Sequence, residues 1–405
     1  MTEDPRADLV ARQYRRWQYP EPIEDLEATE AWDFFDPSQA HRVFWPDRPY
    51  QPEMDILVAG CGTNQAPTLA LRNPRARVVG IDISQESLDH GRYLRHKHGL
   101  DNLDLRLLPI EEVGALDRDF DLIVCGGVLH HMASAQAGLD ALAQMLRPDG
   151  VAAIMLYARY GRVGVEMMQS VFRRLGLRQD EESLRLVRAG LDWVDADHPV
   201  RTYLGNAPDL SYDTGMVDTF LHGRDVSFDV PGCVDLVEAA GLVFQGWLLN
   251  KKYYPPTLVH PGDAFLAAIG ALPEREQWAV MEQVYHFNAC HLFMACRPER
   301  PEGSYRIDFA GAGARDYVPS WRLQTRLDGE TLVRHDGWAI TLADTVLAMA
   351  QAVDGRRSVR EIAARASATQ GADAGGLERT AVELFAQLWK LDFVCVDLSA
   401  AVTPR

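Results

Sequence analysis

The chain has 405 residues, 47% of them hydrophobic and 24% charged, with a formal net charge of −17 at pH 7. One core rarely grows beyond about 250–300 residues, so this length predicts two or three domains. The negative charge argues against nucleic acid or an anionic membrane as the main partner. Six scattered cysteines without a C-x-x-C pair favour a reducing, cytoplasmic setting. No signal-peptide pattern opens the chain, and no apolar run reaches the roughly 18 residues of a membrane span.

Residues 1–50 are rich in aromatic side chains and are expected to form an N-terminal cap segment. Tyr14 and Tyr19 stand out, in the stretch that runs to Pro20. An aromatic face attracts a cation, so these two rings are candidates to border a positively charged ligand. The alternative is that they pack an N-terminal helix against the core.

The stretch from Asp55 to Gln65 has the pattern of a strand, a tight turn and a helix. An apolar run ends in Gly60-x-Gly62, where glycine lets the backbone bend sharply and approach a ligand. This short pattern alone also fits a plain strand-to-helix turn. A second apolar strand ends about twenty residues later in Asp82, whose carboxylate can accept hydrogen bonds from both ribose hydroxyls.

Two further motifs follow, FDLIVCGGVLHH at 120–131 and LRPDG at 146–150. Apolar strands alternate with helical patterns here, which predicts a parallel sheet with helices on both faces. The expected strands are 55–59, 77–81, 103–107, 120–125 and 151–157, and the expected helices are 65–72, 85–98 and 134–146. With the glycine turn and Asp82, these motifs resemble class I S-adenosylmethionine-dependent methyltransferases over residues 50–160. The resemblance implies an α/β fold with a Rossmann-like seven-stranded sheet, and S-adenosyl-L-methionine as cofactor.

The resemblance places the cofactor across the carboxyl ends of the first two strands. It implies that Asp82 binds the ribose, that Ile110 packs on the adenine and that Glu111 bonds the adenine amino group. Glu111 also fits a solvated first helical turn. Thr63 would help the glycines to hold the amino acid portion. The implied cofactor-binding residues are Tyr14, Tyr19, Ala59, Gly60, Cys61, Gly62, Asn64, Gln65, Asp82, Ile83, Ile110, Glu111, Gly126 and Gly127.

The glycine turn departs from the family pattern at two positions. Val58 stands where the family usually has an acidic residue, and Asn64 stands where a third glycine is usual. Asparagine tolerates a positive φ better than most residues, so the turn is expected to survive. Asp55 lies too early to replace the missing carboxylate. Main-chain carbonyls near Ala59 and Gly127, or Gln13, are expected to hold the cofactor's amino group instead.

The expected catalytic residues are His131, His130 and Tyr157, at the carboxyl ends of the fourth and fifth strands. Imidazole titrates near neutral pH, so His131 is a candidate general base. The alternative is a structural pair of histidines, since methyl transfer needs little beyond alignment of the acceptor. Tyr157 and Arg159 are expected at the mouth of the same cleft, or packed at the edge of the sheet.

Two insertions, about 162–230 and 250–286, interrupt the alternation, and the resemblance implies that such insertions form a substrate lid. Phe220, His222, Arg224 and Asp225 are candidates for substrate contacts; an alternative is a turn with an Arg–Asp surface pair of little energetic weight. The complete set of expected substrate residues is Tyr19, Tyr157, Arg159, Phe220, His222 and Arg224.

No metal site is expected from the sequence. His286, Cys290, His291 and Cys296 lie near one another, but their spacings fit no zinc pattern and the segment reads as a strand.

A proline-rich linker near residue 300 precedes a change of periodicity. The expected domains are thus a cap at 1–50, a methyltransferase domain at 51–300 and a small winged-helix-like α+β domain at 301–405. The last resembles PqqD-like peptide-recognition domains, in which an edge strand and a helix capture an extended peptide. Alternatively, this domain only packs or dimerises.

These features predict a methyltransferase that acts on a peptide or peptide-like natural product, with in-line transfer to an O or N nucleophile. One alternative is a small-molecule O- or N-methyltransferase of secondary metabolism. Another is a non-catalytic methyltransferase-like binding subunit. No nucleic-acid or membrane partner is expected. The sequence leaves open whether the chain forms a homodimer.

Overall fold

The computed structural model describes residues 9–28, 33–285, 287–370 and 374–402. The chain divides into two compact units. The first takes Met1–Gln39, Gln51–Gly246 and Tyr285–Glu299, and the second takes Ala40–Tyr50, Trp247–Val284 and Arg300–Arg405. The change of unit after Glu299 falls at the expected linker. The second insertion, which the sequence assigned to the methyltransferase domain, belongs instead to the C-terminal unit.

The first unit is built on a seven-stranded sheet in the order β3-β2-β1-β4-β5-β7-β6. The strands from β1 to β5 pair in parallel, and β7 runs antiparallel to β5, which confirms the expected fold class. The strands are β1 Asp55–Ala59, β2 Arg77–Asp82, β3 Leu103–Leu107, β4 Phe120–Gly126, β5 Leu146–Tyr157, β6 Val243–Trp247 and β7 Cys290–Cys296.

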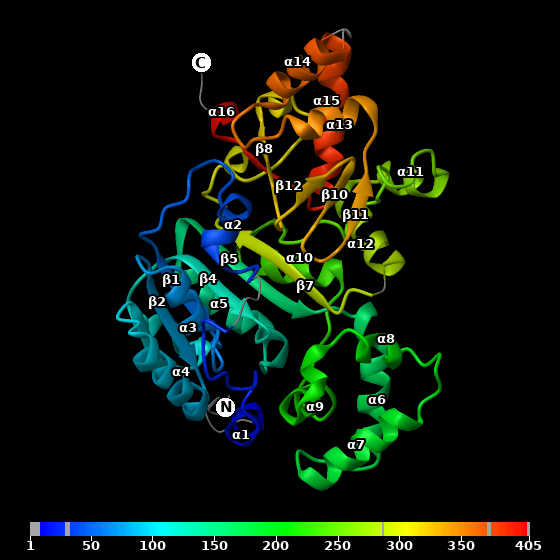
Figure 1. The fold of residues 1–405 in the computed structure, drawn as a ribbon. Coiled ribbons are helices and arrows are strands. Elements are labelled where there is room, and N and C mark those ends of the chain that lie inside the picture. The colour runs from blue at the N-terminus through cyan, green and yellow to red at the C-terminus, as the bar shows by residue number, and fades with distance from the viewer. Residues whose placement is uncertain (1–8, 29–32, 286, 371–373, 403–405) are drawn as a thin grey trace. The chain divides into compact units, whose positions relative to one another are not determined.

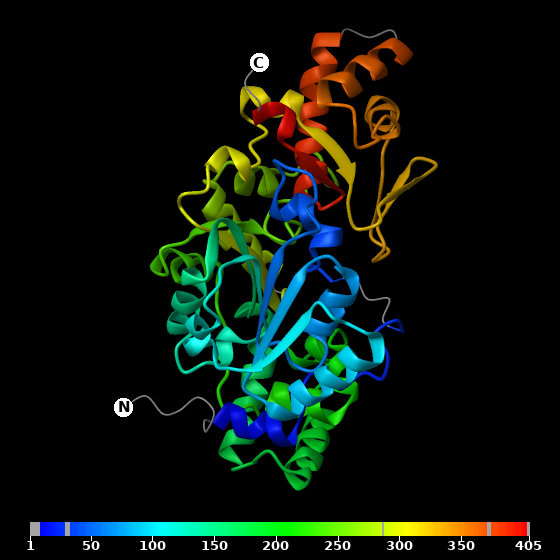
Figure 2. The same ribbon diagram turned by 90° about the vertical axis from the view of Figure 1, so that its left-hand side faces the viewer.

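Helices cover both faces of this sheet, with α3 and α4 on one face and α5 and α10 on the other (Figures 1 and 2). They span Gln65–Arg72 (α3), Gln85–His98 (α4), Ala135–Gln144 (α5) and Val230–Ala239 (α10). Helix α4 begins and ends where its sequence predicts: the Ser84 side chain accepts a hydrogen bond from Ser87 N, and Gly99 adopts a left-handed φ of 62°. Because both faces are covered, all five residues of β1 are buried.

The first insertion forms the lid, here defined as residues 162–226. It contains α6 Val163–Arg174, α7 Glu181–Trp193, α8 Val200–Leu204 and α9 Asp213–Phe220. Apolar residues of these helices form a core of their own, in which the rings of Phe172 and Phe220 meet edge to face at 6.0 Å. Helix α1, Leu9–Arg16, lies at the same end of the sheet as α9 (Figure 1).

The second unit has the α+β content expected of the C-terminal domain, whereas its winged-helix character stays a prediction. Strands β8 (Val318–Trp321) and β12 (Val394–Asp397) form one antiparallel pair. A second, three-stranded antiparallel sheet has the order β11-β10-β9. The other elements of this unit are β9 Arg326–Asp328, β10 Thr331–Val333, β11 Ala339–Thr341, α11 Ala264–Gly270, α12 Glu274–Val284, α13 Asp344–Gln351, α14 Val359–Gln370, α15 Ala374–Lys390 and α16 Ser399–Val402. The division between the units falls within α2, Pro37–Phe44, after Gln39.

A buried carboxylate explains why the second insertion joins this unit. Asp392 is fully buried and accepts hydrogen bonds from the backbone N–H groups of Asn250 and Lys251 at 3.0 and 2.9 Å. Arg322 donates to the same carboxylate at 2.7 Å. An unpaired buried charge is costly, so these donors fix the insertion to the C-terminal domain. Across the part of the chain described, no helix has the length and apolarity needed to span a bilayer.

The end of the first sheet at which β1 begins is stabilised by an ionic network around the buried Asp55. Arg77 donates to Asp55 Oδ1 and Oδ2 at 2.7 and 2.6 Å, and Arg147 donates to Oδ2 at 2.7 Å. Burial would raise the pKa of Asp55, but the hydrogen bonds and charges of the two guanidinium groups outweigh it and lower the pKa. Asp55 is therefore a structural residue, as its position predicts.

We expect Asp55→Asn to lower the free energy of unfolding at pH 7 by about 1.5–3 kcal/mol, the range for hydrogen bonds to a charged group. A lowered pKa gives stability that is present above the unfolded value of about 3.9 and is lost as the pH falls through the folded value. The deficit of the variant should thus shrink in acid. Urea denaturation at pH 7 and at acidic pH tests this. Asp104→Asn, in an exposed pair with Arg106, is the matched control and should change stability little. An equal deficit in both variants would contradict the assignment.

Candidate functional site

The glycine turn between β1 and α3 lies directly against the N-terminal segment, here residues 9–28. Gly60 and Gly62 have φ values of +70° and +55°, which glycine alone adopts easily. A Cβ on Gly62 would come within 3.0 Å of Pro20 Cδ. Thr63 donates to the Pro20 carbonyl at 2.9 Å, so its hydroxyl is engaged by the N-terminal segment rather than free for a ligand.

Two expectations for this turn need correction or refinement. Asn64 has a φ of −138°, so the position of the usual third glycine requires no positive φ in this chain. Ala59 and Cys61 are buried, and the backbone N–H groups of Gly60 and Cys61 both donate to the Ile81 carbonyl. The turn is therefore fixed to β2 by the backbone, and its buried side chains serve the core.

Asp82 ends β2 beside this turn. Its carboxylate accepts hydrogen bonds from the backbone N–H groups of Gly62 at 2.8 Å and Ser84 at 2.9 Å. Burial raises the pKa of Asp82, although these hydrogen bonds oppose the shift. The residue as a whole is half-buried, and the two hydrogen bonds fix the orientation of its carboxylate. A carboxylate in this position suits a ribose diol, whose two hydroxyl groups can donate to its oxygens.

The other expected cofactor residues lie around the same edge of the sheet. Ile110 is buried and Glu111 is exposed, side by side at the start of the short helix η2, Ile110–Leu116. Ile83 is half-buried after β2. A Cβ on Gly126 would come within 3.2 Å of the Phe35 ring and 3.5 Å of Gln65 Nε2, and Gly127 has a φ of +78°. Phe35 thus borders the site, which sequence reasoning missed.

Tyr14 and Tyr19 point their hydroxyl groups at carboxylates of the lid region. Tyr14 donates to Asp218 Oδ1 at 3.0 Å, and Tyr19 donates to Asp209 Oδ2 at 3.0 Å. Burial, with Asp218 next, raises the pKa of Tyr14, and the Asp82 charge also acts on it. Tyr14 therefore contacts the lid and lies near Asp82, the carboxylate at which the sequence analysis expects the cofactor.

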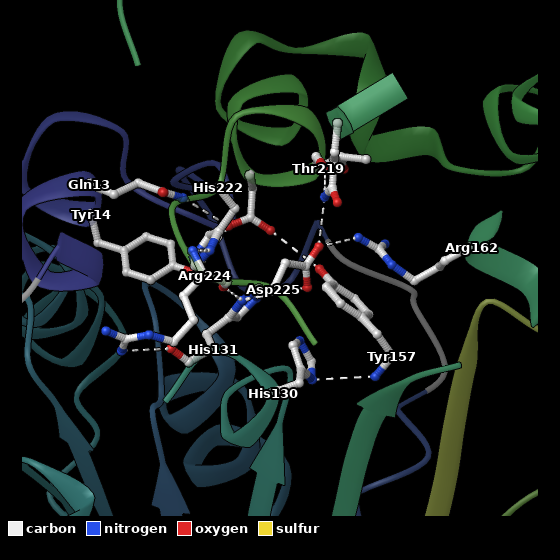
Figure 3. A network of polar contacts seen from close by, with 12 residues as sticks. Gln13, Tyr14, His130, His131, Tyr157, Arg162, Thr219, His222, Arg224 and Asp225 are labelled. Atoms are coloured by element: carbon white, nitrogen blue, oxygen red, sulfur yellow. Dashed lines mark hydrogen bonds and ion pairs between the residues drawn. The ribbon is translucent and has the colours of Figure 1, made fainter. Parts of the chain in front are cut away.

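A buried polar cluster lies at the carboxyl ends of β4 and β5, beneath the lid (Figure 3). It brings together the three expected catalytic residues, four other residues named from the sequence, and two that the sequence did not single out. We use "the polar cluster" for the following buried or half-buried side chains: Gln13, Tyr14, His130, His131, Tyr157, Arg162, Asp218, His222 and Asp225.

Arg162 and Asp225 form the charged core of the cluster. Arg162 is fully buried and donates to Asp225 Oδ2 at 2.7 Å, while its guanidinium carbon lies 3.6 Å from the Tyr157 ring centre. Gln169 donates to the same Asp225 oxygen at 2.8 Å. The ion pair and the cation–π contact together compensate the buried guanidinium. Asp225 thus pairs with Arg162, and the Arg224–Asp225 surface pair considered from the sequence does not form.

The hydrogen bonds of the three histidines define where each neutral ring carries its proton. His222 Nδ1 accepts from Arg224 N at 3.1 Å, and His130 Nδ1 accepts from Tyr157 N at 3.3 Å, so both rings carry the proton on Nε2. His131 Nδ1 faces the Arg224 carbonyl at 3.0 Å and must donate to it, which leaves a lone pair on Nε2.

These rings are neutral at physiological pH. Burial lowers the pKa values of His131 and His222 to about 4, and burial followed by the neighbouring His131 lowers that of His130. At neutral pH, His131 is therefore the one ring of the three with a free lone pair, but it is a weak base. His131 and His222 stack with their ring centres 3.8 Å apart, which neutral rings permit.

Two expected substrate residues lie elsewhere. Phe220 is 2% exposed and packs inside the lid core, so it is a structural residue. Arg159 is exposed and pairs with Asp229, the N-cap of α10, at 2.5 Å. By contrast, His222 belongs to the polar cluster, and the Arg224 backbone orients two of its histidines.

Sequence reasoning missed Asp218 and Arg162. The sequence around each of them contains a pattern that could have revealed it. Asp218 interrupts the apolar run GMVDTFL, and Arg162 directly precedes an amphipathic helix. A charge placed in or beside an apolar stretch indicates a buried, paired group. What the sequence does not show is the partner, since Asp218 is 204 residues from Tyr14.

The polar cluster also bears on the expectation that the chain holds no metal. His131, Asp218 and His222 each offer a ligand atom within 4.8 Å of the others. However, a metal-binding imidazole needs its lone pair, and the Nε2 atoms of His222 and His130 carry protons in this arrangement. His291 Nε2 faces the Phe228 carbonyl at 3.1 Å, and His286 lies outside the described residues. We therefore assign no metal here.

The sheet order and the glycine turn beside Asp82 are those of a Rossmann-like fold of the kind found in methyltransferases. Residues 57–152 match the family model described as "Methyltransferase domain". Among curated proteins, the chain is 28% identical over 243 residues to the uncharacterized protein syc1184_c of Synechococcus sp., covering 57% of this chain and 58% of that protein. It is 25% identical over 97 residues to a ubiquinone biosynthesis O-methyltransferase of Neisseria meningitidis, covering 24% of this chain and 41% of that protein.

Among solved structures, the chain is similar to PKMT2 from Rickettsia typhi. The TM-score is 0.64 at 15% identity, and the match covers 91% of this chain and 76% of that one. A structure of the same protein in complex with AdoHcy gives a TM-score of 0.62 at 15% identity over 88% of this chain and 74% of that one. At this identity the similarity shows the fold. The similarity in fold covers many more residues than the 57–152 that match the family model.

We expect Arg162→Met to lower the free energy of unfolding by about 3–5 kcal/mol, because it leaves the buried Asp225 carboxylate unpaired. Asp225→Asn in the same background should recover part of this loss, since it removes the uncompensated charge. Urea denaturation of the two single variants and the double variant measures the coupling. If the double variant loses the sum of the two single losses, the two residues do not act as a buried pair.

Proposed function

We propose that the protein is an S-adenosyl-L-methionine-dependent methyltransferase. The observation that carries this proposal is Asp82, a carboxylate held by two backbone N–H groups at the end of β2, next to a glycine turn. Asp82 would bind the ribose hydroxyls, Ile110 and Glu111 would meet the adenine, and Gly126 and Gly127 would leave room beside the sulfonium. The family-model match at residues 57–152 supports the same reading.

The chain's own residues would supply orientation and exclusion of water. A bound S-adenosyl-L-methionine supplies a methyl group on a positively charged sulfur, which is already activated for transfer. Tyr14 and Tyr19, from the N-terminal segment, would lie over it, as both contact the lid region. The polar cluster would then hold the acceptor's O or N atom in line with the methyl carbon, and alignment of this kind accounts for much of the catalytic effect.

The substrate that we favour is a peptide or peptide-like natural product. The support is the three-stranded sheet of the second unit, where β9 and β11 lie at the edges. Edge strands carry unpaired backbone groups to which an extended peptide can add. A small-molecule O- or N-methyltransferase is the second candidate, supported by the match to ubiquinone biosynthesis O-methyltransferases over 97 residues. A non-catalytic binding subunit is the third, and transfer of labelled methyl to any substrate would exclude it.

Asp82→Ala should weaken binding of S-adenosylmethionine and of its demethylated product by about 1.5–3 kcal/mol, the range for hydrogen bonds to a charged group. This corresponds to roughly a 10- to 150-fold rise in Kd. Asp55→Ala is the matched control: it removes a β-strand carboxylate at the other end of the sheet and should leave Kd nearly unchanged. Isothermal titration calorimetry measures both. The opposite order would show that the site is misplaced, and no micromolar binding by the wild type would exclude the proposed function.

For the peptide, we expect amides in β9 or β11 to gain protection from hydrogen exchange when the full chain binds its peptide. Precursor peptides encoded beside the gene are the probes, with scrambled sequences as controls. Deletion of residues 301–405 is a poorer test, since it would remove Asp392 and Arg322 from the second insertion. Methyl transfer to the peptide without any protection in the second unit would count against capture by strand addition.

A further inference from the structure

Asp218 differs from the other buried carboxylate of the polar cluster. Asp225 is paired with Arg162, whereas the hydrogen-bond partners of Asp218 within the described ranges are all neutral. Tyr14 and Gln13 donate to Oδ1 at 3.0 and 3.3 Å. The Tyr157 hydroxyl donates to Oδ2 at a longer distance, 3.4 Å. Asp218 is thus a 2% exposed carboxylate without a pairing cation, and Oδ2 is its less engaged oxygen.

The charges around Asp218 leave the cluster with an excess of negative charge. Asp218 and Asp225 contribute two negative charges and Arg162 one positive charge, while the histidines are neutral, so the sum is −1. A buried charge that is not neutralised is costly to keep, and an incoming proton relieves that cost. In agreement, burial raises the pKa of Asp218 above its ordinary range.

His131 Nε2 is the competing proton acceptor, because its ring has the one free lone pair among the three histidines. Protonation there would place a second positive charge near Arg162, and burial already lowers the pKa of His131 to about 4. Protonation of Asp218 instead removes an unpaired charge. Where two groups can take a proton in a buried site, the anion without a cation partner is favoured.

We propose that Asp218 is the catalytic base of this site, its Oδ2 atom accepting the proton that the methyl acceptor releases. The proposal rests on the methyltransferase function proposed above. The acceptor's O or N atom attacks the methyl carbon and forms the new bond to carbon. The carbon–sulfur bond breaks with its electron pair going to sulfur, which becomes a neutral thioether. The proton leaves the acceptor for Asp218, and the resulting carboxylic acid later returns it to water.

The hydrogen bonds of Asp218 suit this role. Gln13 and Tyr14 come from α1, Tyr157 from the end of β5 and Asp218 itself from α9, so three separate elements fix the carboxylate. Gln13 and Tyr14 both donate to Oδ1, while Oδ2 accepts only the longer hydrogen bond from Tyr157 among the described residues, so Oδ2 is the oxygen left for a further hydrogen bond. The other charged or titratable groups near Asp218 are His131, His222, Asp225, Arg162, Tyr19 and Tyr212.

The decisive variant is Asp218→Asn in the full chain. It keeps an oxygen for Tyr14 and Gln13 but cannot take a proton. We expect S-adenosylmethionine affinity to stay near the wild-type value, while single-turnover methyl transfer falls by about 10²- to 10⁴-fold, the usual effect of losing a general base. The acceptor probe is a pool of synthetic peptides carrying Ser, Thr, Lys and His side chains and free amino ends. Asp213→Asn, an exposed residue on the same helix, is the matched control and should transfer at the wild-type rate.

A pH profile separates catalysis from a structural role. The base must be ionised, so the wild-type rate should fall as the pH drops through the pKa of Asp218. Tyr14→Phe removes a hydrogen bond that lowers this pKa, so the acid limb should move to higher pH. A structural Asp218 would leave the limb in place. In parallel, infrared difference spectra of wild type against Asp218→Asn, recorded without ligand, should show the carboxylic acid band titrating above the ordinary range of about 3.9.

Each remaining outcome is also informative. A rate of methyl transfer in Asp218→Asn equal to that of the wild type would overturn the proposal. A carboxyl band that titrates at or below the ordinary range would also overturn it, and that measurement needs no acceptor in the pool. Loss of transfer with EDTA and recovery with a divalent cation would overturn it as well, because a cation would then neutralise Asp218. Failure of the wild type to bind S-adenosylmethionine would instead refute the proposed function.

Discussion

The first unit depends on how it accommodates a fully buried guanidinium. Arg162 sits where the sheet gives way to the lid, and its charge must be matched inside the protein because water does not reach it. Asp225, near the far end of the lid sequence, supplies the matching charge at 2.7 Å, and the Tyr157 ring covers the guanidinium plane. This pairing joins the two ends of the lid to the tip of β5. The polar cluster, with its neutral histidines and its unpaired Asp218, is built around it.

Much of the fold could be predicted because its determinants are local. The alternation of apolar strands with helices, the Ser84 cap and the Gly99 stop all lie within short stretches, and the sheet forms as expected. The position of Asp82 could be predicted for the same reason, since the end of one strand fixes it. The second insertion shows the limit. Its attachment depends on Asp392, a carboxylate more than 140 residues away, which no local pattern reveals.

The polar cluster could be predicted only in part. His130, His131 and Tyr157 were found because strand ends of a parallel sheet meet at one edge. The positions of the protons on the histidine rings could not be predicted, because they depend on which backbone groups of the lid face each ring. Phe220 was misjudged for a related reason: an aromatic residue in a loop-like stretch reads as a contact residue, but the lid has a core of its own and takes the ring into it.

The contact between the N-terminal segment and the glycine turn has a consequence for how such a chain can vary. A Cβ at position 62 would approach both the Pro20 ring and the Tyr19 carbonyl, at 3.0 and 3.1 Å. Glycine at 62 is therefore required twice, by its own backbone and by a segment more than forty residues upstream. Natural sequences with this architecture should therefore change at the turn and at the Tyr-Pro step together.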